Sequence, residues 1–543
     1  MSALSKVILN DRRETPQTEK ADDRQSKNNA NGYSYVVSDK DRFRRFLTIG
    51  VENGTYYVGE QKLTDDSVKF VEKCIASAGV EAIDEIVRVS DEGLAPKNDQ
   101  AIFALAVAFR SNDNSVKTAA KAAVNKVCRT GTHLFMFVGF LKNVTGMGRA
   151  KTSAVANWYE SKSDSDLAFQ SVKYRQRNGF THRDLLRIAH PKGLNESLVN
   201  FMLGKEFDIT EVPSIVQAFD RLQNAKSESA VLAAIAAHDN VSWEMIPTDF
   251  HKSPAVWKAL FKSGMPQMAL LRNVTRMARL GLFDDMVFAA DYAAQLSDAK
   301  RIEKSRIHPI NYLNALVTYE EGQVNRSGYH SFGVYRSKDW TTNAKISKAL
   351  NDGYKLAFKN VVPSGKRTFV ALDVSGSMAS KASGIDLSCA QVSGALASFI
   401  AASEPYSEIR GFTSSGGWGR GAELTDLGIS ESDSLNTVME KISGHSFGGT
   451  DCALPMKYAF ENDLEVDTFI VVTDNETWAG NGHPHEWLKK YNKKMGRNAK
   501  LVVVAATATE FTIAEEGNPL MLDVSGFDSS TPKVIADFSA GRI

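Results

Sequence analysis

Three oxygen-bearing side chains follow an apolar run in the stretch ALDVSGSM, residues 371–378. Asp373, Ser375 and Ser377 alternate along this turn, and Gly376 permits a tight bend. Hard divalent cations such as Mg²⁺ bind about six oxygen ligands, several of which are usually water. The spacing favours a cation site over a serine nucleophile, because the first glycine of the G-x-S-x-G nucleophile elbow is missing.

Two later loops supply further ligands, with Thr450 in FGGTDCA and Asp474 in VVTDNE. Together with the first loop they resemble the metal-ion-dependent adhesion site of von Willebrand factor A domains. The resemblance implies that Ser375, Ser377 and Thr450 contact the metal directly. It also implies that Asp373 and Asp474 act largely through water, and that one position stays open for a partner's carboxylate. We expect Mg²⁺ in this site, with Mn²⁺ and Ca²⁺ as alternatives.

Other chemistries fit the sequence less well. A metal-dependent nuclease or phosphatase stays open as an alternative, but the predicted ligands are rich in hydroxyls and lack a second carboxylate cluster. PSGKRT lacks the earlier glycine and the Ser or Thr after lysine that a phosphate loop needs. His483, His485 and Glu486 in GHPHE match known zinc spacings poorly, so an ordinary surface loop is the favoured interpretation.

The elements that must position the metal ligands form an α/β pattern. The short apolar runs RTFVALDVSGSM, DTFIVVTDNETW and AKLVVVAATA alternate with stretches of helical composition. This alternation predicts a doubly wound parallel sheet over residues 361–543, whose ligands bind where the strands end.

The preceding part of the chain has a helical pattern. SVKFVEKCIASA places Val68, Val71 and Ile75 on one face, and similar segments of about 12 to 18 residues follow, separated by Gly, Asn, Asp or Pro signals. Paired helices without strands predict a stacked helical-repeat domain over residues 31–360, with a globular helical domain as the alternative. Residues 1–30 hold few large apolar side chains and are expected to form a disordered polar tail.

Composition limits the class of protein. The 543 residues are 43% hydrophobic and 24% charged, which is typical of a globular protein of two or more domains. No apolar run is long enough for a membrane span, and we expect a cytoplasmic protein with no membrane partner. The four scattered cysteines form no CxxC pair and are expected to be reduced, mostly buried thiols.

Charge is divided unevenly along the chain. Residues 361–543 hold 15 Lys and Arg against 23 Asp and Glu, whereas the whole chain holds 65 against 64. Residues 1–360 are therefore basic, which favours a polyanion as the partner of this part of the chain.

The densest basic stretch is KYRQRNGFTHRDLLRIAHPK at residues 173–192, with aromatic side chains among the charges. Arginine binds phosphate through two nitrogens and aromatic rings stack on unpaired bases, so this mixture suits RNA. Solvated helix faces are the alternative. The candidate RNA-binding residues are Lys142, Arg149, Lys151, Lys173, Arg175, Arg177, His182, Arg183, Arg187, Arg272 and Arg276.

Five motifs in order resemble the TROVE-domain proteins, which comprise the Ro autoantigen and its bacterial and phage relatives. They begin with NGYSYVVSDKDRFRRFLTIGVENGTYYVGEQKLT at 32–64 and KYRQRNGFTHRDLLRIAH at 173–190. MPQMALLRNVTRMARLGLF at 265–283, RIHPINYLNALVTYEEG at 306–322 and FIVVTDNETWAG at 469–480 follow.

This resemblance implies a ring of HEAT-like helical repeats closed by the von Willebrand A-like domain. It implies that the ring takes single-stranded 3′ ends of misfolded noncoding RNAs and that its outer surface binds Y RNAs, with His182 at the position of an RNA-contacting histidine. An exoribonuclease such as polynucleotide phosphorylase is the implied protein partner. We therefore expect a noncatalytic RNA-binding protein, with a metal-dependent protein-adhesion scaffold as the alternative.

Overall fold

The computed structural model divides into two compact units, Val68–Ala357 and a second unit that joins Met1–Ser67 to Phe358–Ile543. The structure describes residues 14–49, 60–95, 97–144, 146–177, 179–322, 339–358, 362–380, 387–414, 422–429, 433–443, 449–507, 509–525 and 530–543.

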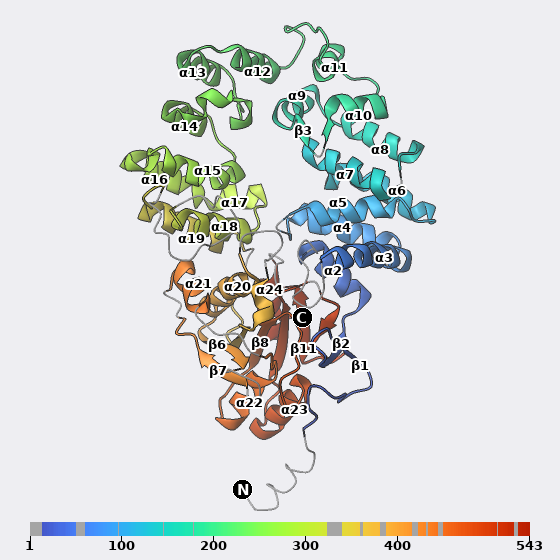
Figure 1. Ribbon diagram of the computed structural model, residues 1–543, viewed down its shortest axis with the longest axis vertical. Coiled ribbons are helices and arrows are strands. Elements are labelled where there is room, and N and C mark those ends of the chain that lie inside the picture. Colours follow the sequence, from blue (N-terminus) through green and yellow to red (C-terminus); the bar gives the residue numbers. More distant parts are fainter. Residues whose placement is uncertain are drawn as a thin grey trace, which may run out of the picture. The chain divides into compact units, whose positions relative to one another are not determined.

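Paired helices build the first unit (Figure 1). Its earlier helices are α4 (Val80–Glu92), α5 (Asp99–Ala108), α6 (Asn114–Val127), α7 (Gly131–Val144), α8 (Arg149–Glu160), α9 (Asp164–Lys173), α10 (His182–Ala189) and α11 (Glu196–Leu203). The later ones are α12 (Ser214–Asn224), α13 (Glu228–Ala237), α14 (Pro254–Lys262), α15 (Gln267–Arg279), α16 (Met286–Leu296), α17 (Ala299–Ser305), α18 (Pro309–Glu320) and α19 (Ala344–Leu356).

Alternate helices pack side by side in this unit. Helix α4 contacts α6, α6 contacts α8, and α5 contacts α7, so each amphipathic helix buries its apolar face against neighbours in two layers. This arrangement confirms the predicted helical-repeat architecture.

An ion pair joins helices that are far apart in the sequence of this unit. Arg306, which follows α17, lies 2.8 Å from Asp91 in α4. Gly93 caps α4 with a φ of 66°, and a Cβ added to it would lie 2.8 Å from the carbonyl oxygen of Arg306. A glycine is required here both by the left-handed backbone and by this close approach. Closure of a ring by the other unit stays a prediction.

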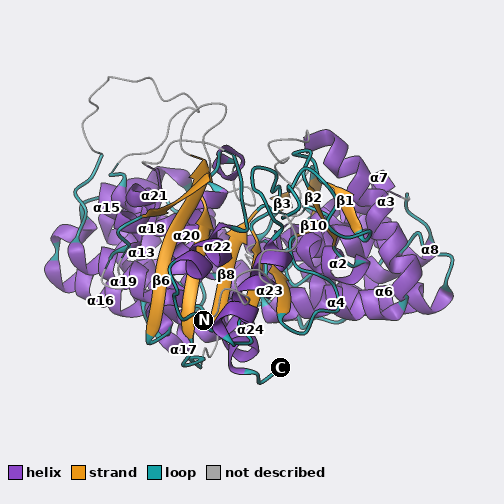
Figure 2. Ribbon diagram, turned by 90° about the horizontal axis from the view of Figure 1, so that it is seen from below, coloured by secondary structure: helices purple, strands orange, loops and turns teal. Residues whose placement is uncertain are grey.

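A six-stranded sheet forms the centre of the second unit (Figure 2). Its strands are β5 (Arg367–Asp373), β6 (Tyr406–Ser414), β7 (Ala422–Asp426), β8 (Thr468–Thr473), β9 (Lys500–Ala505) and β11 (Met521–Ser525), and their order is β11-β9-β8-β5-β6-β7. All neighbours are parallel except β6 and β7. The order reverses between β5 and β8, and open sheets of this kind bind ligands at such a switch point.

Helices cover both faces of this sheet, as the doubly wound prediction requires. One face packs on α22 (Leu454–Glu461) and α23 (Pro484–Met495), and the other packs on α20 (Cys389–Ser403), α21 (Leu435–Ser443) and α24 (Thr531–Ala540). Because β5, β8 and β9 are buried on both faces, their sequences are continuous apolar runs rather than alternating ones.

The N-terminal segment, residues 14–37, packs against this α/β unit. Strands β1 (Gln25–Lys27) and β2 (Tyr33–Val36) form a three-stranded sheet with β10 (Phe511–Thr512). Gln17 is fully buried, donates from Nε2 to Asp451 Oδ1 at 2.6 Å and to the Gly482 carbonyl at 3.1 Å, and accepts from the Thr477 hydroxyl.

This packing corrects the sequence-based boundaries. The prediction of a disordered tail over residues 1–30 is wrong for residues 14–30, and residues 1–13 lie outside the described part of the chain. The helical domain predicted over residues 31–360 corresponds to Val68–Ala357, because the residues before it join the α/β unit. Low apolar content misled the prediction, since buried hydrogen bonds hold the segment in place.

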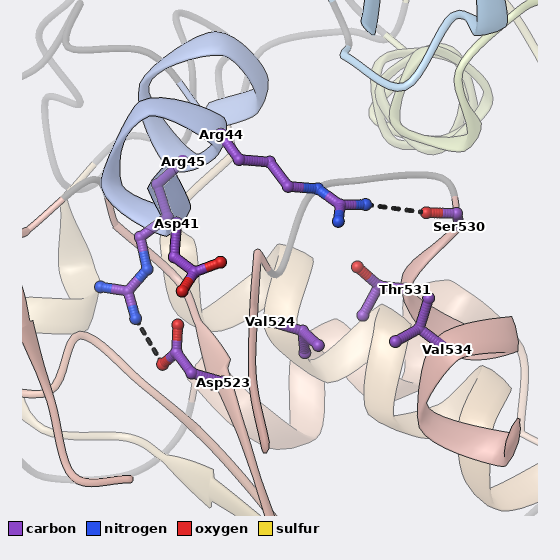
Figure 3. A pocket seen from close by; sticks show the side chains of 8 residues that line it. All are labelled: Asp41, Arg44, Arg45, Asp523, Val524, Ser530, Thr531 and Val534. Carbon is purple, nitrogen blue, oxygen red and sulfur yellow. Dashed lines mark hydrogen bonds and ion pairs between the residues drawn. The ribbon is translucent and has the colours of Figure 1, made fainter. Parts of the chain in front are cut away.

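Helix α2 (Asp39–Ile49) continues from this segment and is held by a buried arginine (Figure 3). Arg45 is 1% exposed, forms an ion pair with Asp523 of β11, and donates to the carbonyls of Thr509 and Phe511, both at 2.9 Å. Its Nη1 and Nη2 groups are paired in this way, which offsets the cost of burying the guanidinium charge. Arg44 on the same helix reaches the Ser530 hydroxyl at 3.5 Å.

Two other predictions concern the whole chain. All four cysteines are free and buried, as predicted. Among the helices that the structure describes, none combines the length and apolar character that a membrane span requires.

Replacing Gln17 with alanine is expected to lower the free energy of unfolding by about 2 kcal/mol, because buried polar groups of Asp451 and Thr477 lose a partner. Urea denaturation measures this loss, and limited proteolysis should show faster cleavage within the N-terminal segment. Thr18→Ala, at an exposed neighbouring position, is the control and should behave as wild type. Equal stability of the two variants would contradict the assigned role of Gln17.

Candidate metal and nucleic-acid sites

Asp373 ends β5 in the centre of the sheet and is fully buried. Its Oδ1 accepts a hydrogen bond from the Ser375 backbone N–H at 3.0 Å, and its Oδ2 accepts one from the Thr473 hydroxyl of β8 at 2.7 Å. The chain then turns into a short 3₁₀ helix, Gly376–Ala379. These bonds fix both the turn and the direction of the carboxylate.

The parallel register of β5 and β8 places Asp474 beside this turn. The Ser377 side chain is close enough to Asp474 to lower its pKa, and the hydroxyls of Ser375 and Ser377 lie 3.1 Å apart. Burial, and then the charge of Asp474, raise the pKa of Asp373 above its usual range. Burial also raises the pKa of Asp474. The structure therefore brings together four of the five predicted metal ligands.

The composition of this cluster fits a divalent cation. Within the described residues, neither Asp373 nor Asp474 forms an ion pair with a lysine or arginine, although both are buried. Two buried carboxylates without a cation are costly, and a divalent ion offsets that cost. The hydroxyl oxygens of Ser375 and Ser377 are hard ligands of the kind that Mg²⁺ prefers.

The fifth predicted ligand, Thr450, lies on a neighbouring loop and is buried. Its carbonyl accepts hydrogen bonds from the backbone N–H groups of Trp478 and Ala479, both at 3.0 Å. This ties its loop to the loop that follows Asp474. A role for the Thr450 hydroxyl at the metal stays a prediction.

The GHPHE stretch is not the surface loop that the sequence suggested. His483 caps the start of α23 and is buried beneath the N-terminal segment, with one ring nitrogen 2.9 Å from the Glu19 carbonyl and the other 3.1 Å from Gln25 Nε2. His485 Nδ1 lies 3.3 Å from the Tyr35 hydroxyl. Packing between distant segments accounts for both histidines without zinc.

The predicted RNA-binding residues gather on a hairpin that connects α9 to α10. Strands β3 (Gln176–Arg177) and β4 (Phe180–Thr181) pair so that Arg177 lies opposite Phe180. Lys142 of α7 lies with its ammonium 4.5 Å from the centre of the Phe180 ring. A lysine from a distant part of the sequence therefore packs on an aromatic ring of this hairpin.

Exposed arginines surround this hairpin. The basic surface consists of Lys142, Arg175, Arg177, Arg183 and Arg187, which are all exposed. In the described part of the chain none of them forms an ion pair. The nearest acid, Asp184, is occupied as the third residue of a capping box, where it accepts from the Thr181 hydroxyl at 2.6 Å and the Thr181 N–H at 2.9 Å. The cations are thus left available for a polyanion.

His182 differs from the prediction of a surface contact. Its side chain is 4% exposed, and its Nδ1 lies 2.8 Å from the Tyr159 hydroxyl. Burial lowers the pKa of His182 to about 4, so the ring is neutral at pH 7. The imidazole lines a cavity beside Arg175 and Arg183, and only a ligand that enters this cavity can touch it.

Other predicted residues lie apart from the basic surface. Arg276 is half-buried, with its guanidinium 5.3 Å from the ring centres of both Trp243 and Trp257, and burial lowers its pKa. Lys151 donates to the Gly146 carbonyl at 2.9 Å. A phosphate-binding role is therefore not supported for Arg276, whose charged group packs on aromatic rings. Arg149 is exposed at the start of α8.

Lys173 and Arg272 belong to a second basic group. Burial lowers the pKa of Lys173, Glu244 opposes this shift, and Arg272 adds to it. The same two charges act on the hydroxyl of Tyr174, whose pKa is raised mainly by burial. The end of α9 and the exposed side of α15 therefore contribute to one electrostatic environment.

Comparison with known proteins gives a consistent result along the whole chain. The TROVE domain matches residues 26–240 and 238–332, and the Ro60 vWA domain matches residues 367–539. The chain belongs to the TROVE-domain (Ro) family.

Two relatives of this family are called RNA-binding protein RO60. The Caenorhabditis elegans protein is 33% identical over 609 residues, covering 97% of this chain and 92% of its own length. The Deinococcus radiodurans protein is 36% identical over 538 residues, covering 97% of this chain and 98% of its own length. The crystal structure of the Deinococcus radiodurans Ro (Rsr) protein matches with a TM-score of 0.66 at 34% identity, covering 93% of this chain and 100% of that one.

Sequence reasoning missed several residues of both sites. Thr473 directly precedes Asp474, and its hydroxyl donates to Asp373 on the neighbouring strand. A hydroxyl residue at a strand end beside an acid could have indicated this role from the sequence. Gln17 hydrogen-bonds Asp451 from a distant segment. Phe219, also distant in sequence, packs against Arg175, with 4.9 Å between the guanidinium carbon and the ring centre. Only the tertiary structure brings these two to the sites.

The metal assignment predicts that Mg²⁺ raises the melting temperature of the wild-type protein, since a ligand that binds only the folded state stabilises it. At 100 times the dissociation constant the gain is about 2.7 kcal/mol. Asp373→Asn should abolish this gain, as measured by thermal unfolding with and without the cation. Asp467→Asn, at a partly exposed residue that pairs with Arg497 just before β8, is the control. A normal Mg²⁺ response in Asp373→Asn would refute the assignment.

The neutral, buried imidazole of His182 predicts a pH dependence of stability. An unfolded histidine has a pKa of about 6.5, so the unfolded state binds more protons than the folded state between about pH 6.5 and 4. The contribution of His182 to the free energy of unfolding is therefore fully present above this window. It falls as the pH falls through the window, by about 2 kcal/mol between pH 7 and 5. In urea denaturation, the free energy of unfolding of His182→Gln should fall by correspondingly less over this pH range than that of the wild type. An unchanged profile would contradict the burial of a neutral ring.

Proposed function

We propose that this protein binds RNA through the basic surface of its helical unit and does so without catalysing a reaction. The observation that carries the proposal is the cluster of exposed arginines around the β3–β4 hairpin, which form no ion pair within the described residues. Family membership supports the same function, because the relatives in Caenorhabditis elegans and Deinococcus radiodurans carry the name RNA-binding protein.

The geometry of this surface suits a structured RNA. Guanidinium groups bind phosphate oxygens through two parallel hydrogen bonds, and a folded RNA presents phosphates on its outside. The Lys142 ammonium packs on the ring of Phe180, which is the strand partner of Arg177. Contacts of this kind provide affinity for the RNA backbone, and we infer that Y RNA-like molecules are the structured ligands.

A second part of the proposal concerns single-stranded RNA. Lys173, Tyr174 and Arg272 combine two cations with an aromatic ring, which is the combination that holds unpaired nucleotides. We infer that this group binds the 3′ ends of misfolded or fragmentary noncoding RNAs. In this proposal the protein acts in RNA quality control and hands such RNAs to an exoribonuclease.

The metal site supports a second candidate function, protein adhesion. Trp478 is 40% exposed, and its backbone N–H is bonded to the carbonyl of Thr450 beside the proposed cation. An exposed indole next to a cation with an open coordination position suits a protein partner that supplies a carboxylate and an apolar neighbour. In the proposed function this partner is the nuclease.

The RNA-binding proposal predicts a strong salt dependence. Replacing both Arg175 and Arg183 with alanine should weaken binding of a hairpin RNA and reduce the slope of log affinity against log salt by about 1 to 2, because each lost phosphate contact contributes about 0.7 to 0.9. Fluorescence anisotropy at several salt concentrations measures both effects. Lys348→Ala, at an exposed lysine paired with Asp352, is the control and should leave binding unchanged.

Two outcomes would contradict the proposal. If the wild-type protein binds no RNA beyond a nonspecific background, the adhesion function is left as the better interpretation. If the double variant binds with wild-type affinity and slope, the RNA contacts lie elsewhere on the protein.

A further inference from the structure

Two buried carboxylates flank the predicted metal ligands without belonging to them. Asp451 directly follows Thr450 and is 5% exposed, and Glu476 lies two residues after Asp474 and is fully buried. Within the described residues, neither carboxylate forms an ion pair with a lysine or arginine. Together with Asp373 and Asp474, four buried acids therefore lie on neighbouring loops of this unit.

Neutral groups of the N-terminal segment hold both flanking carboxylates. Gln17 Nε2 donates to Asp451 Oδ1 at 2.6 Å, and the Asn29 amide donates to Glu476 Oε1 at 2.7 Å. The backbone N–H of Ala30 donates to the other oxygen of Glu476 at 3.2 Å. Amide groups carry no net charge, so they orient these acids without cancelling their negative charge.

The segment also contacts the loop after β8 closely. Asn28 Nδ2 donates to the Thr477 carbonyl at 2.9 Å, and a Cβ added to Gly32 would overlap the same carbonyl oxygen. The Thr477 hydroxyl in turn donates to Gln17 and accepts from the Cys452 backbone N–H at 3.2 Å. Displacement of the segment would therefore disturb the loops on both sides of the predicted cation.

The affinity of a protein site for a divalent cation depends on the negative charge around it and on the rigidity of its loops. We propose that the N-terminal segment sets the cation affinity of the metal site by holding Asp451 and Glu476 in place as carboxylates without a basic partner. Gln17 and Asn29 are then positioning residues, because they act on the cation through these acids. The inference rests on the proposed metal site and adds what determines its affinity.

A purely structural role of the segment has different consequences. Loss of its hydrogen bonds would then lower the free energy of unfolding, but the molecules that stay folded would bind the cation as before. In the proposed role, a positive charge brought to Glu476 weakens cation binding even where it leaves the fold as stable as before. Cation affinity and stability must therefore be measured separately.

Asn29→Lys separates these roles, because position 29 is exposed and a lysine there brings an ammonium to Glu476. The dissociation constant of Mn²⁺ should rise about tenfold, the scale on which one nearby charge acts on a divalent ion. The free energy of unfolding without metal should not fall, since the lysine pairs with a buried acid. Ser26→Lys adds the same charge at an exposed position of β1 and is the matched control.

Electron paramagnetic resonance of free Mn²⁺ measures the dissociation constant on the folded, full-length protein, and Mg²⁺ is then added as a competitor. Urea denaturation without metal measures the stability of the same samples. Asn29→Lys should combine weakened binding of both cations with undiminished stability, whereas Ser26→Lys should match the wild type in both measurements.

A second pair of variants tests the contact with Asp451. Gln17→Ala removes the donor to Asp451 and should raise the dissociation constant of Mn²⁺ severalfold. Val466→Ala, at a buried residue just before β8, lowers stability at the end of this strand opposite Asp474 and should bind Mn²⁺ as the wild type does. This pair decides the question even if Asn29→Lys fails to fold.

The possible results separate the two proposals. Wild-type affinity in Asn29→Lys, or equal weakening in Asn29→Lys and Ser26→Lys, would overturn the role of the segment, because charge beside Glu476 would have no specific effect. Equal affinities of Gln17→Ala and Val466→Ala would overturn it as well. In these cases the wild-type protein still binds Mn²⁺ and the metal site is retained. Failure of the wild-type protein to bind Mn²⁺ or Mg²⁺ would refute the metal site itself.

Discussion

The α/β unit is organised around two buried carboxylates at the ends of adjacent parallel strands. Asp373 and Asp474 lie where β5 and β8 finish, and no described lysine or arginine neutralises them. Such groups are costly to bury, so their surroundings must supply donors. The Thr473 hydroxyl and the Ser375 backbone N–H donate to Asp373, and the Ser377 side chain lowers the pKa of Asp474 against the effect of burial.

The N-terminal segment extends this arrangement outward. Gln17 bonds Asp451, beside Thr450, while Asn29 and the backbone of Ala30 bond Glu476, two residues after Asp474. One segment thus stabilises the loop that holds Thr450, between α21 and α22, and the loop that follows β8. This gives the segment a structural reason to be ordered despite its polar composition, because its hydrogen bonds are shielded from water.

The helical unit follows a different principle, in which buried side chains set the positions of exposed ones. His182, Phe219 and Asp184 do not belong to the exposed basic surface, yet they fix the turn, the stacking and the helix cap that carry its arginines. Arginines fixed in this way lose less conformational freedom when a phosphate binds.

The sequence by itself determined the two architectures, the strand-end loops that carry Asp373 and Asp474, and the basic stretch, because these depend on local periodicity and on strand ends that a parallel sheet must bring together. It did not place residues 14–30, whose contacts lie more than 400 positions away along the chain. Nor did it separate the exposed Arg183 from the buried His182 beside it, since both begin the same helix. Only the tertiary structure decided these points, because burial and pairing depend on which distant elements meet.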